Sequence, residues 1–277
     1  MRRLFACALA VIAISGCGDN GSNKGEQKGS AGKFGSPTRI GNPFLPLHPG
    51  TKFVLVGKIK EGGKRVPHRV EFLVTDLTKV VHGVRTRVVW DRDYDNGRLV
   101  EGELAFFAQD DAGNVWSYGE YPEEWEGRKL AGAPSTWIPG VQGAKPGIMM
   151  KGAPRAGTPE YSQGLAPAID FRDRARVKAT GQRTCVPTGC YSGVLVTEER
   201  SPDEPNARQL KYYAPTVGNV RVGFTGEGQD EGLVLQRVVQ LTAAERKRAA
   251  AGALALDRRA YCIARKVYGA TPRAVAG

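Results

Sequence analysis

The sequence has 277 residues, of which 41% are hydrophobic, and its formal net charge is +12. This length is ample to bury a core and fits one large β domain or two small ones after export and tether segments are set aside. The net positive charge permits attraction to anionic lipid headgroups or to an anionic envelope polymer. We exclude nucleic acid as a partner, because the chain carries no DNA- or RNA-reading motif.

The first sixteen residues have the composition of an export signal. Arg2 and Arg3 precede an unbroken apolar run over 4–14, which is too short to span a bilayer as a mature helix. The run ends in Ile-Ser-Gly-Cys17, which resembles the bacterial lipobox, where the peptide is cut before the cysteine and the thiol is acylated. We predict a lipoprotein signal peptide over 1–16 and lipidation of Cys17 by palmitate-type chains. The alternative is an ordinary secretory signal that leaves this cysteine as a thiol.

An acylated Cys17 predicts a cell-envelope protein, lipid-anchored to the outer membrane or to the outer face of the plasma membrane. Stable anchoring takes two lipid signals, which a diacylated or triacylated cysteine supplies without a transmembrane helix. Arg2 and Arg3 leave with the signal, so the mature charge is 12 − 2 = +10. Residues 17–39 are rich in Gly, Ser, Lys and Asn, which predicts a flexible tether.

An antiparallel β domain is expected over 40–241. After a proline-rich lead-in, the hydrophobic period becomes two, and Val70, Phe72 and Val74 alternate with polar residues. This alternation predicts strands with one dry face and one wet face. Asp-Asn-Gly97 is a strong hairpin signal. The stretch from 52 to 120 therefore predicts a meander of about five strands.

The following part of the chain predicts shorter elements. Residues 121–168 are dense in Gly and Pro, which indicates short strands and a long crossing loop. Further strands are expected within 171–181, 191–197, 209–213, 219–224 and 232–241.

The period changes again at the C-terminal end. Thr242 and Glu245 have the spacing of a capping box. An alanine-rich helix packed on the β domain is expected over 242–268, followed by a tail over 269–277. The residues expected to face the sheet are Leu254, Ala255, Arg258, Tyr261, Cys262 and Ala264. The predicted fold class is mainly β: a strongly curved antiparallel sheet or open β-barrel with one C-terminal α-helix.

Cysteine usage agrees with an oxidising compartment. Cys185 and Cys190 flank a short Pro/Gly turn, where a hairpin would bring them to disulfide separation. We predict this bridge, because the spacing is not that of a thioredoxin-like pair and a zinc site would lack its other ligands. Three states stay open for Cys262: a buried thiol, an unpaired thiol, or the true disulfide partner of Cys185 or Cys190.

No catalytic residue, cofactor or metal site is predicted. Asp91, Asp93 and Asp95 match the first three positions of a calcium loop, but Asn96 and Gly102 stand where it needs Gly and Glu. We interpret the three carboxylates as a solvated strand end.

A second acidic group is formed by Glu123, Glu124 and Glu126 around Trp125. A glycosidase carboxylate pair is defined by geometry that the sequence does not give. We interpret this group as an acidic turn.

Aromatic residues give the one physical indication of ligand binding. Phe107, Trp116, Tyr118 and Tyr213 belong to aromatic runs or pairs along strands, and adjacent pairs place one ring on each face. Core packing explains only one of the two faces. The other face is therefore covered by the long loop or the helix, or it lines a ligand cavity.

Three phrases resemble a family of uncharacterised bacterial exported proteins and lipoproteins. They are Asn-Pro-Phe-Leu-Pro-Leu-His-Pro-Gly-Thr51, Gln-Asp-Asp-Ala-Gly-Asn-Val-Trp-Ser-Tyr-Gly-Glu120 and Lys-Tyr-Tyr-Ala-Pro-Thr-Val-Gly218. The resemblance covers about residues 40–240 and implies no established activity or catalytic residue. Cys185 and Cys190 depart from the family pattern, which implies that their bridge is dispensable to the fold.

The expected function is that of a non-catalytic, membrane-anchored envelope lipoprotein. Its partners would be the membrane, through the N-terminal lipid, and an apolar or amphipathic ligand or an envelope partner. The alternative is an envelope hydrolase that acts on cell-wall polymer with carboxylates that the sequence does not pair. The absence of nucleophile and metal motifs favours the binding protein.

Overall fold

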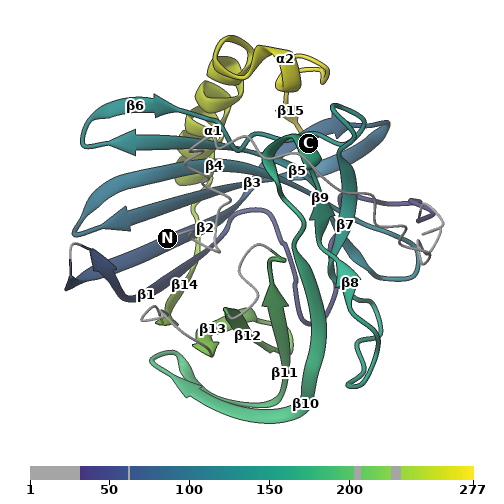
Figure 1. Ribbon diagram of the computed structural model, residues 1–277, viewed down its shortest axis with the longest axis vertical. Helices are drawn as coiled ribbons and strands as arrows, with labels where there is room; N and C mark the ends of the chain where they lie inside the picture. The colour runs from purple at the N-terminus through teal and green to yellow at the C-terminus, as the bar shows by residue number, and fades with distance from the viewer. Residues whose placement is uncertain (1–31, 62, 203–206, 226–231) are drawn as a thin grey trace, which may run out of the picture.

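The computed structural model describes residues 32–61, 63–202, 207–225 and 232–277. Its strands form one large antiparallel sheet that curves strongly on itself, with the main helix at the C-terminal end of the chain (Figure 1). The expected fold class, a curved antiparallel sheet with one C-terminal helix, is confirmed. The predicted signal peptide, the Cys17 lipidation site and most of the tether lie outside the described residues.

The first seven strands begin at the lead-in and include the predicted meander. They are β1 (Thr51–Glu61), β2 (Lys64–Val81), β3 (Val84–Asp95), β4 (Arg98–Gln109), β5 (Val115–Glu126), β6 (Lys129–Gly132) and β7 (Lys145–Met150). The remaining elements are β8 (Tyr161–Ser162), β9 (Gly164–Leu165), the 3-10 helix Pro167–Ile169, β10 (Arg174–Val186), β11 (Gly189–Arg200), β12 (Arg208–Ala214), β13 (Gly218–Thr225), β14 (Gly232–Gln240), α1 (Ala243–Ile263), α2 (Arg265–Tyr268) and β15 (Val275–Ala276). The five-strand meander is confirmed as β1 to β5.

The hydrogen-bonded order of the sheet is β8-β10-β11-β12-β13-β14-β1-β2-β3-β4-β5-β7-β9, with β6 paired to β5 and β15 paired to β2. The sheet is not closed by strand pairing. Its two edge strands, β8 and β9, are nevertheless consecutive in sequence and separated only by Gln163. The chain itself therefore connects the two edges of the curved sheet.

Local turn chemistry sets the register of the central strands. Asn96 and Gly97 have φ values of 48° and 77°, and His82 and Gly83 have values of 47° and 79°. Left-handed φ at both central residues is the signature of the two-residue hairpin turn whose twist matches that of its strands. The hairpin predicted at Asp95–Gly97 is confirmed, and it fixes which β3 side chains lie opposite which β4 side chains.

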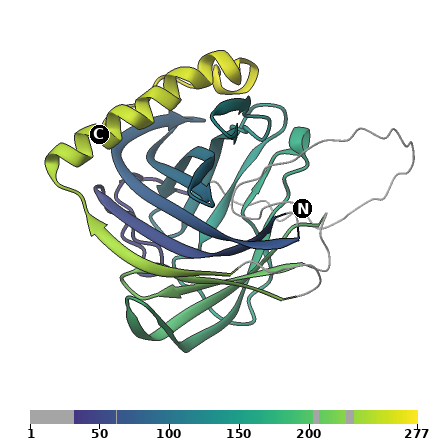
Figure 2. The ribbon, with the colours of Figure 1, turned by 90° about the vertical axis from the view of Figure 1, so that its left-hand side faces the viewer.

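The two faces of the sheet carry separate cores. On one face, Phe107 of β4 belongs to the same buried cluster as Val177 of β10, Val194 of β11 and Leu235 of β14. Because strands far apart in the sheet order contribute to one cluster, this is the inner side of the curve, called here the concave face. The opposite, outer face packs under α1 through residues such as Phe106 of β4. Figure 2 shows α1 running along the outside of the sheet.

The C-terminal helix begins as predicted and packs differently from the prediction. Thr242 and Glu245 form both hydrogen bonds of a capping box. The buried helix residues are Ala253, Leu256, Asp257 and Ala260. The predicted sheet-facing set is wrong at Arg258 and Cys262, which are exposed, whereas its members Leu254, Tyr261 and Ala264 pack against the outer-face cluster. The helix is rotated because Asp257, a charge that a hydrophobic pattern assigns to solvent, is buried.

Candidate binding site on the concave face

The concave face changes from apolar to acidic across the sheet. One row of register partners runs from Phe72 on β2 to Asp91 on β3 and then to Glu103 on β4. The next row runs from Val70 to Asp93 and Glu101. Residues paired in register share a face of the sheet. Strands β3 and β4 therefore place four carboxyl groups beside the apolar surface of β2.

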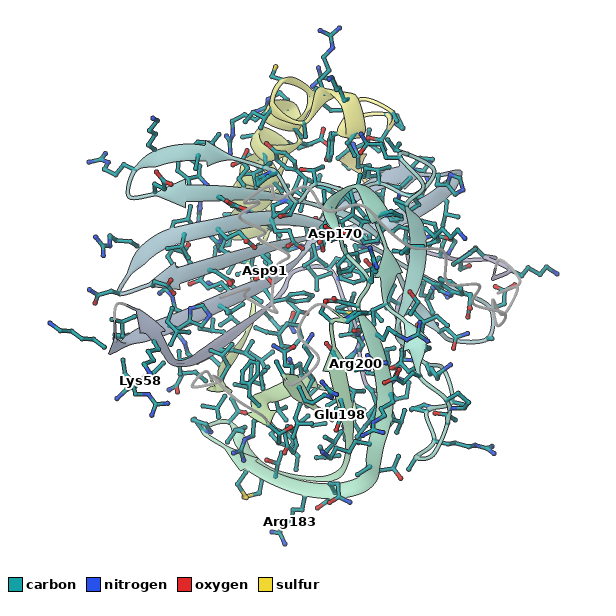
Figure 3. The ribbon with its side chains drawn as sticks, viewed as in Figure 1. Lys58, Asp91, Asp170, Arg183, Glu198 and Arg200 are labelled. Carbon is teal, nitrogen blue, oxygen red and sulfur yellow. A yellow bond between two sulfur atoms is a disulfide. The ribbon has the colours of Figure 1, made fainter. Side chains whose placement is uncertain are left out.

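A fifth carboxyl group joins this set from β5. Glu120 pairs with Ala105, which is two residues from Glu103 on β4. The acidic cluster is defined here as Asp91, Asp93, Glu101, Glu103 and Glu120. Figure 3 shows Asp91 near the middle of the molecule, within the curve of the sheet.

The acidic cluster corrects the interpretation of the β3 carboxylates as a solvated strand end. Asp93 and Asp95 are 5% and 2% exposed. They alternate onto one face of β3, but that face is the inside of a curved sheet. A period of two identifies the shared face and does not say whether another part of the sheet covers it.

Burial changes the acidity of the cluster. It raises the pKa of Asp91 to about 7, an effect that the adjacent Arg92 partly offsets. Burial raises the pKa of Glu120 to about 7 as well. For Glu103, burial and the neighbouring Glu120 and Glu101 carboxylates hold the pKa well above its usual range. The cluster therefore contains protonated carboxyl groups near neutral pH, which donate hydrogen bonds as well as accept them.

An ion pair from the other end of the sheet shares the concave face. Lys211 of β12 lies 2.7 Å from Glu199 of β11, and both side chains are buried. Lys211 also lies close enough to Asp91 to oppose the rise of its pKa. The acidic cluster is therefore next to the β11–β12 strands in space, although they are far apart in the sheet order.

Two buried polar side chains near this ion pair have no hydrogen-bond partner among the described residues. Gln209, which is 1% exposed, lies opposite Glu199 and has neither its amide oxygen nor its amide nitrogen bonded. The Tyr161 hydroxyl is also unbonded, and its pKa is raised by burial and by Glu199. Buried polar atoms usually have a protein, water or ligand partner. These groups mark the concave face as incompletely satisfied by the residues that the structure describes.

A histidine that the sequence interpretation left without a role borders this site. His68 is 2% exposed, and its Nδ1 lies 2.7 Å from Asp95 Oδ1. His68 of β2 and Asp95 of β3 are direct register partners beside the β3–β4 turn. The hairpin signal at residues 95–97 located this strand end, but no sequence signal identified the pairing with His68.

The four aromatic residues predicted to bind ligand do not converge. Phe107 and Tyr213 both belong to the buried cluster of the concave face. Tyr118 and Trp116 pack with the outer-face cluster, where the Trp116 indole N–H donates to Asp110 Oδ2 at 2.8 Å. Burial raises the pKa of Tyr118 to about 12. A single site can therefore use Phe107 and Tyr213 together, and a shared role for all four stays a prediction without a common surface.

The acidic turn expected at Glu123, Glu124 and Glu126 is wrong. All three residues lie inside β5, which ends at Glu126, and the Glu123 side chain is buried. It accepts hydrogen bonds from Arg259 of α1 at 2.8 and 2.7 Å and from the Tyr121 hydroxyl at 2.8 Å. Its structural role is to bind the helix to the outer face.

The predicted disulfide is present. Cys185 and Cys190 are bonded, with Cα atoms 4.0 Å apart, at the β10–β11 turn. Cys262 is a free, exposed thiol on α1, which decides among the three states left open for it. Among the described residues, no group of three or more His, Cys, Asp and Glu side chains is arranged to hold a metal ion.

Comparisons with known proteins find remote structural similarity. A protein from Bacteroides fragilis, described as exported and with a YmcC-like fold, is similar at a TM-score of 0.37 and 14% identity, over 71% of this chain and 98% of that chain. A protein from Parabacteroides distasonis, described as a lipoprotein, is similar at a TM-score of 0.37 and 12% identity, over 72% and 99%. No protein-family model matches the sequence, and no curated protein matches it. None of the helices within the described ranges has the length and hydropathy needed to cross a membrane.

Proposed function

We propose that this protein is an exported, non-catalytic lipoprotein, anchored to the cell envelope through Cys17, whose concave face binds an amphipathic ligand. The charged start, the apolar run over 4–14 and the lipobox-like ending support the anchor. The disulfide Cys185–Cys190 agrees with an oxidising compartment. The ligand-binding part of the proposal is supported by the concave face.

The main support for ligand binding is the register pairing of Phe72 with Asp91. The two residues are register partners, and both are only half-buried on the concave face. A ligand reaching this point would meet an aromatic ring and a carboxyl group side by side. Its apolar part would lie against Phe72 and Phe107, whose ring centroids are 6.4 Å apart. Its polar head would exchange hydrogen bonds with Asp91 and with Glu120, whose Oε1 has no hydrogen-bond partner among the described residues.

The ligand is tested by native mass spectrometry of the secreted Cys17→Ser protein. Lauric acid and lysophosphatidylcholine serve as amphipathic probes. We expect one probe molecule per chain, and at least about tenfold weaker binding in Phe72→Ala. Tyr94→Ala is the matched control, because Tyr94 is half-buried on the opposite face, where it packs under Arg69. Binding that is lost equally in both variants, or that is absent from the parent, contradicts the proposal.

The anchor is tested separately by cell fractionation. Cys17→Ser should move the protein from the membrane pellet to the soluble envelope or culture fraction, because the acylated thiol is removed. A mutant that stays in the membrane pellet would place the anchor elsewhere in the chain.

A second candidate function, envelope hydrolysis, is favoured by one observation. Asp91 and Glu103 lie directly opposite each other in register, and burial raises the pKa of both. Two facing carboxyl groups, at least one of them with a raised pKa, are what glycosidases use as acid and nucleophile or base. The substrate in this case would be a cell-wall polysaccharide.

Incubation with purified peptidoglycan distinguishes the two functions. Release of reducing ends by the parent chain, abolished in Glu103→Gln and kept in Tyr94→Ala, would establish the hydrolase. No release under conditions where the amphipathic probes bind supports the binding protein.

A further inference from the structure

We infer that the outward face of α1 and α2 is a docking surface for anionic lipid headgroups. This face carries five exposed cationic side chains, called here the basic stripe: Lys247, Arg248, Arg258, Arg265 and Lys266. None of the five forms an ion pair with any carboxylate in the described part of the chain. The stripe is independent of the concave face, so this inference goes beyond the proposed ligand site.

Helix geometry places the three α1 cations, Lys247, Arg248 and Arg258, on the side of α1 opposite its buried residues, and Arg265 and Lys266 follow on α2. Lys247 and Arg258 are eleven residues apart, which is close to three full turns. Between them and Arg265, the outward positions are taken by small residues such as Ala251 and by the exposed Cys262. The buried residues of α1, such as Leu256, point to the sheet. Figure 2 shows this helix along the outside of the molecule, so its remaining face is turned away from the β domain.

The two acidic residues of this segment form no ion pair with the stripe within the described chain, although Arg248 attracts the Glu245 carboxylate electrostatically. Residues 242–277 contain two acids, Glu245 and Asp257. Glu245 accepts hydrogen bonds in the capping box, and Asp257 is buried against Lys79. The two remaining partly buried arginines are already paired, Arg246 with Asp76 and Arg259 with Glu123. The stripe is thus a surface of one charge sign, complementary to anionic headgroups.

The position of the start of the described chain favours a membrane as the partner of the basic stripe. Phe34, close to the start of the described chain, packs edge-on against Trp116 and Tyr118, with the same outer-face cluster that α1 covers. Gly32 is fifteen positions after Cys17, a distance along the chain that spans at most about 50 Å. A lipid at Cys17 would therefore hold the membrane within reach of the face that bears the stripe. Ile263, 39% exposed at the end of α1, adds an apolar contact beside the cations.

The test uses the unlipidated mature chain and sedimentation with vesicles, so it does not depend on the anchor or on the concave-face ligand. We expect binding to vesicles of phosphatidylcholine with phosphatidylglycerol, no binding to pure phosphatidylcholine, and loss of binding at high salt. Replacing all five stripe residues by Gln should weaken the partition onto anionic vesicles by at least about tenfold.

A matched control removes five exposed cations from other surfaces. They are Lys58, Arg98, Arg128, Lys129 and Arg183; Figure 3 shows Lys58 and Arg183 projecting from the edge of the molecule. Because both variants lose the same net charge, retained binding by the control and loss by the stripe variant support a specific surface. Equal loss in both variants, or full binding by a stripe variant with unchanged circular dichroism, overturns the inference.

Discussion

Lys79 Nζ lies 2.9 Å from Asp257 Oδ1, and the two side chains are 0% and 1% exposed. Lys79 comes from β2 and Asp257 from α1, so this ion pair joins the helix to the outer face of the sheet. The ammonium group also donates to the Tyr261 hydroxyl and to the Pro272 carbonyl. Asp257 accepts from the Tyr268 hydroxyl at 2.7 Å. The side-chain hydrogen bonds of Lys79 all go to the C-terminal segment, which explains why that segment folds back on the sheet.

The first prediction concerns stability of this pair. Lys79→Met should lower the free energy of unfolding by about 3–5 kcal/mol, because it leaves the buried Asp257 carboxylate without its charge partner. Urea denaturation measures the loss. Lys58→Met, which removes an exposed lysine, is the control and should change stability by no more than about 0.5 kcal/mol. A loss below about 1 kcal/mol in Lys79→Met would mean that the pair does not hold the helix.

The second prediction is a fall in stability as pH rises. Burial raises the pKa of Asp91 and of Glu120 to about 7, whereas carboxyl groups in an unfolded chain titrate near 4. Between about pH 4 and pH 7, the folded state therefore binds more protons than the unfolded state. The free energy of unfolding therefore decreases from about pH 4 to above pH 7. Glu160 and Glu198 have pKa values that their cationic partners lower. They therefore change the free energy of unfolding only in more acidic solution.

Urea midpoints at pH 5.5 and pH 8.5 measure this dependence. The parent chain should have the lower midpoint at pH 8.5, and the double variant Asp91→Asn, Glu120→Gln should show a smaller difference; Glu103, whose pKa is also raised by burial, accounts for the remainder. A parent midpoint that rises between these two pH values contradicts the assignment of buried, protonated carboxyl groups.

The third prediction concerns the disulfide. Cys185 and Cys190 are separated by five positions, so the bridge closes a very short loop. In the chain-entropy model, such a loop contributes about 2 kcal/mol. The double variant Cys185→Ser, Cys190→Ser should therefore keep its β-rich circular dichroism spectrum and lose no more than this amount. Loss of the folded spectrum would show that the bridge holds more than the β10–β11 turn.

Features determined by neighbouring residues were predictable from the sequence. The hairpin at Asn96-Gly97 and the capping box of Thr242 and Glu245 each depend on a few adjacent positions. The Cys185–Cys190 bridge is likewise contained in one turn. The meander of five strands follows from the alternation of apolar and polar residues, which is also local.

Features that depend on distant strands were not predictable in the same way. Asp91 alternates like a solvent-facing residue, but β11 and β12 lie across from it, and Lys211 acts on its charge. Asp257 looks like a residue of the polar helix face, yet its partner Lys79 is far away in sequence. In both cases the hydrophobic pattern predicted that a charged residue lies on the solvent-exposed face. A buried charge with a distant partner breaks that rule.

The protonation of the acidic cluster can be measured by a carboxyl titration with nuclear magnetic resonance on protein labelled with ¹³C at its Asp and Glu side chains. We predict carboxyl signals that titrate near pH 7 and that disappear one at a time in Asp91→Asn and Glu120→Gln. Such groups are the protonated donors that the concave face would offer to a ligand head. A protein in which every side-chain carboxyl titrates below about pH 5.5, close to the values of exposed groups, would contradict this prediction.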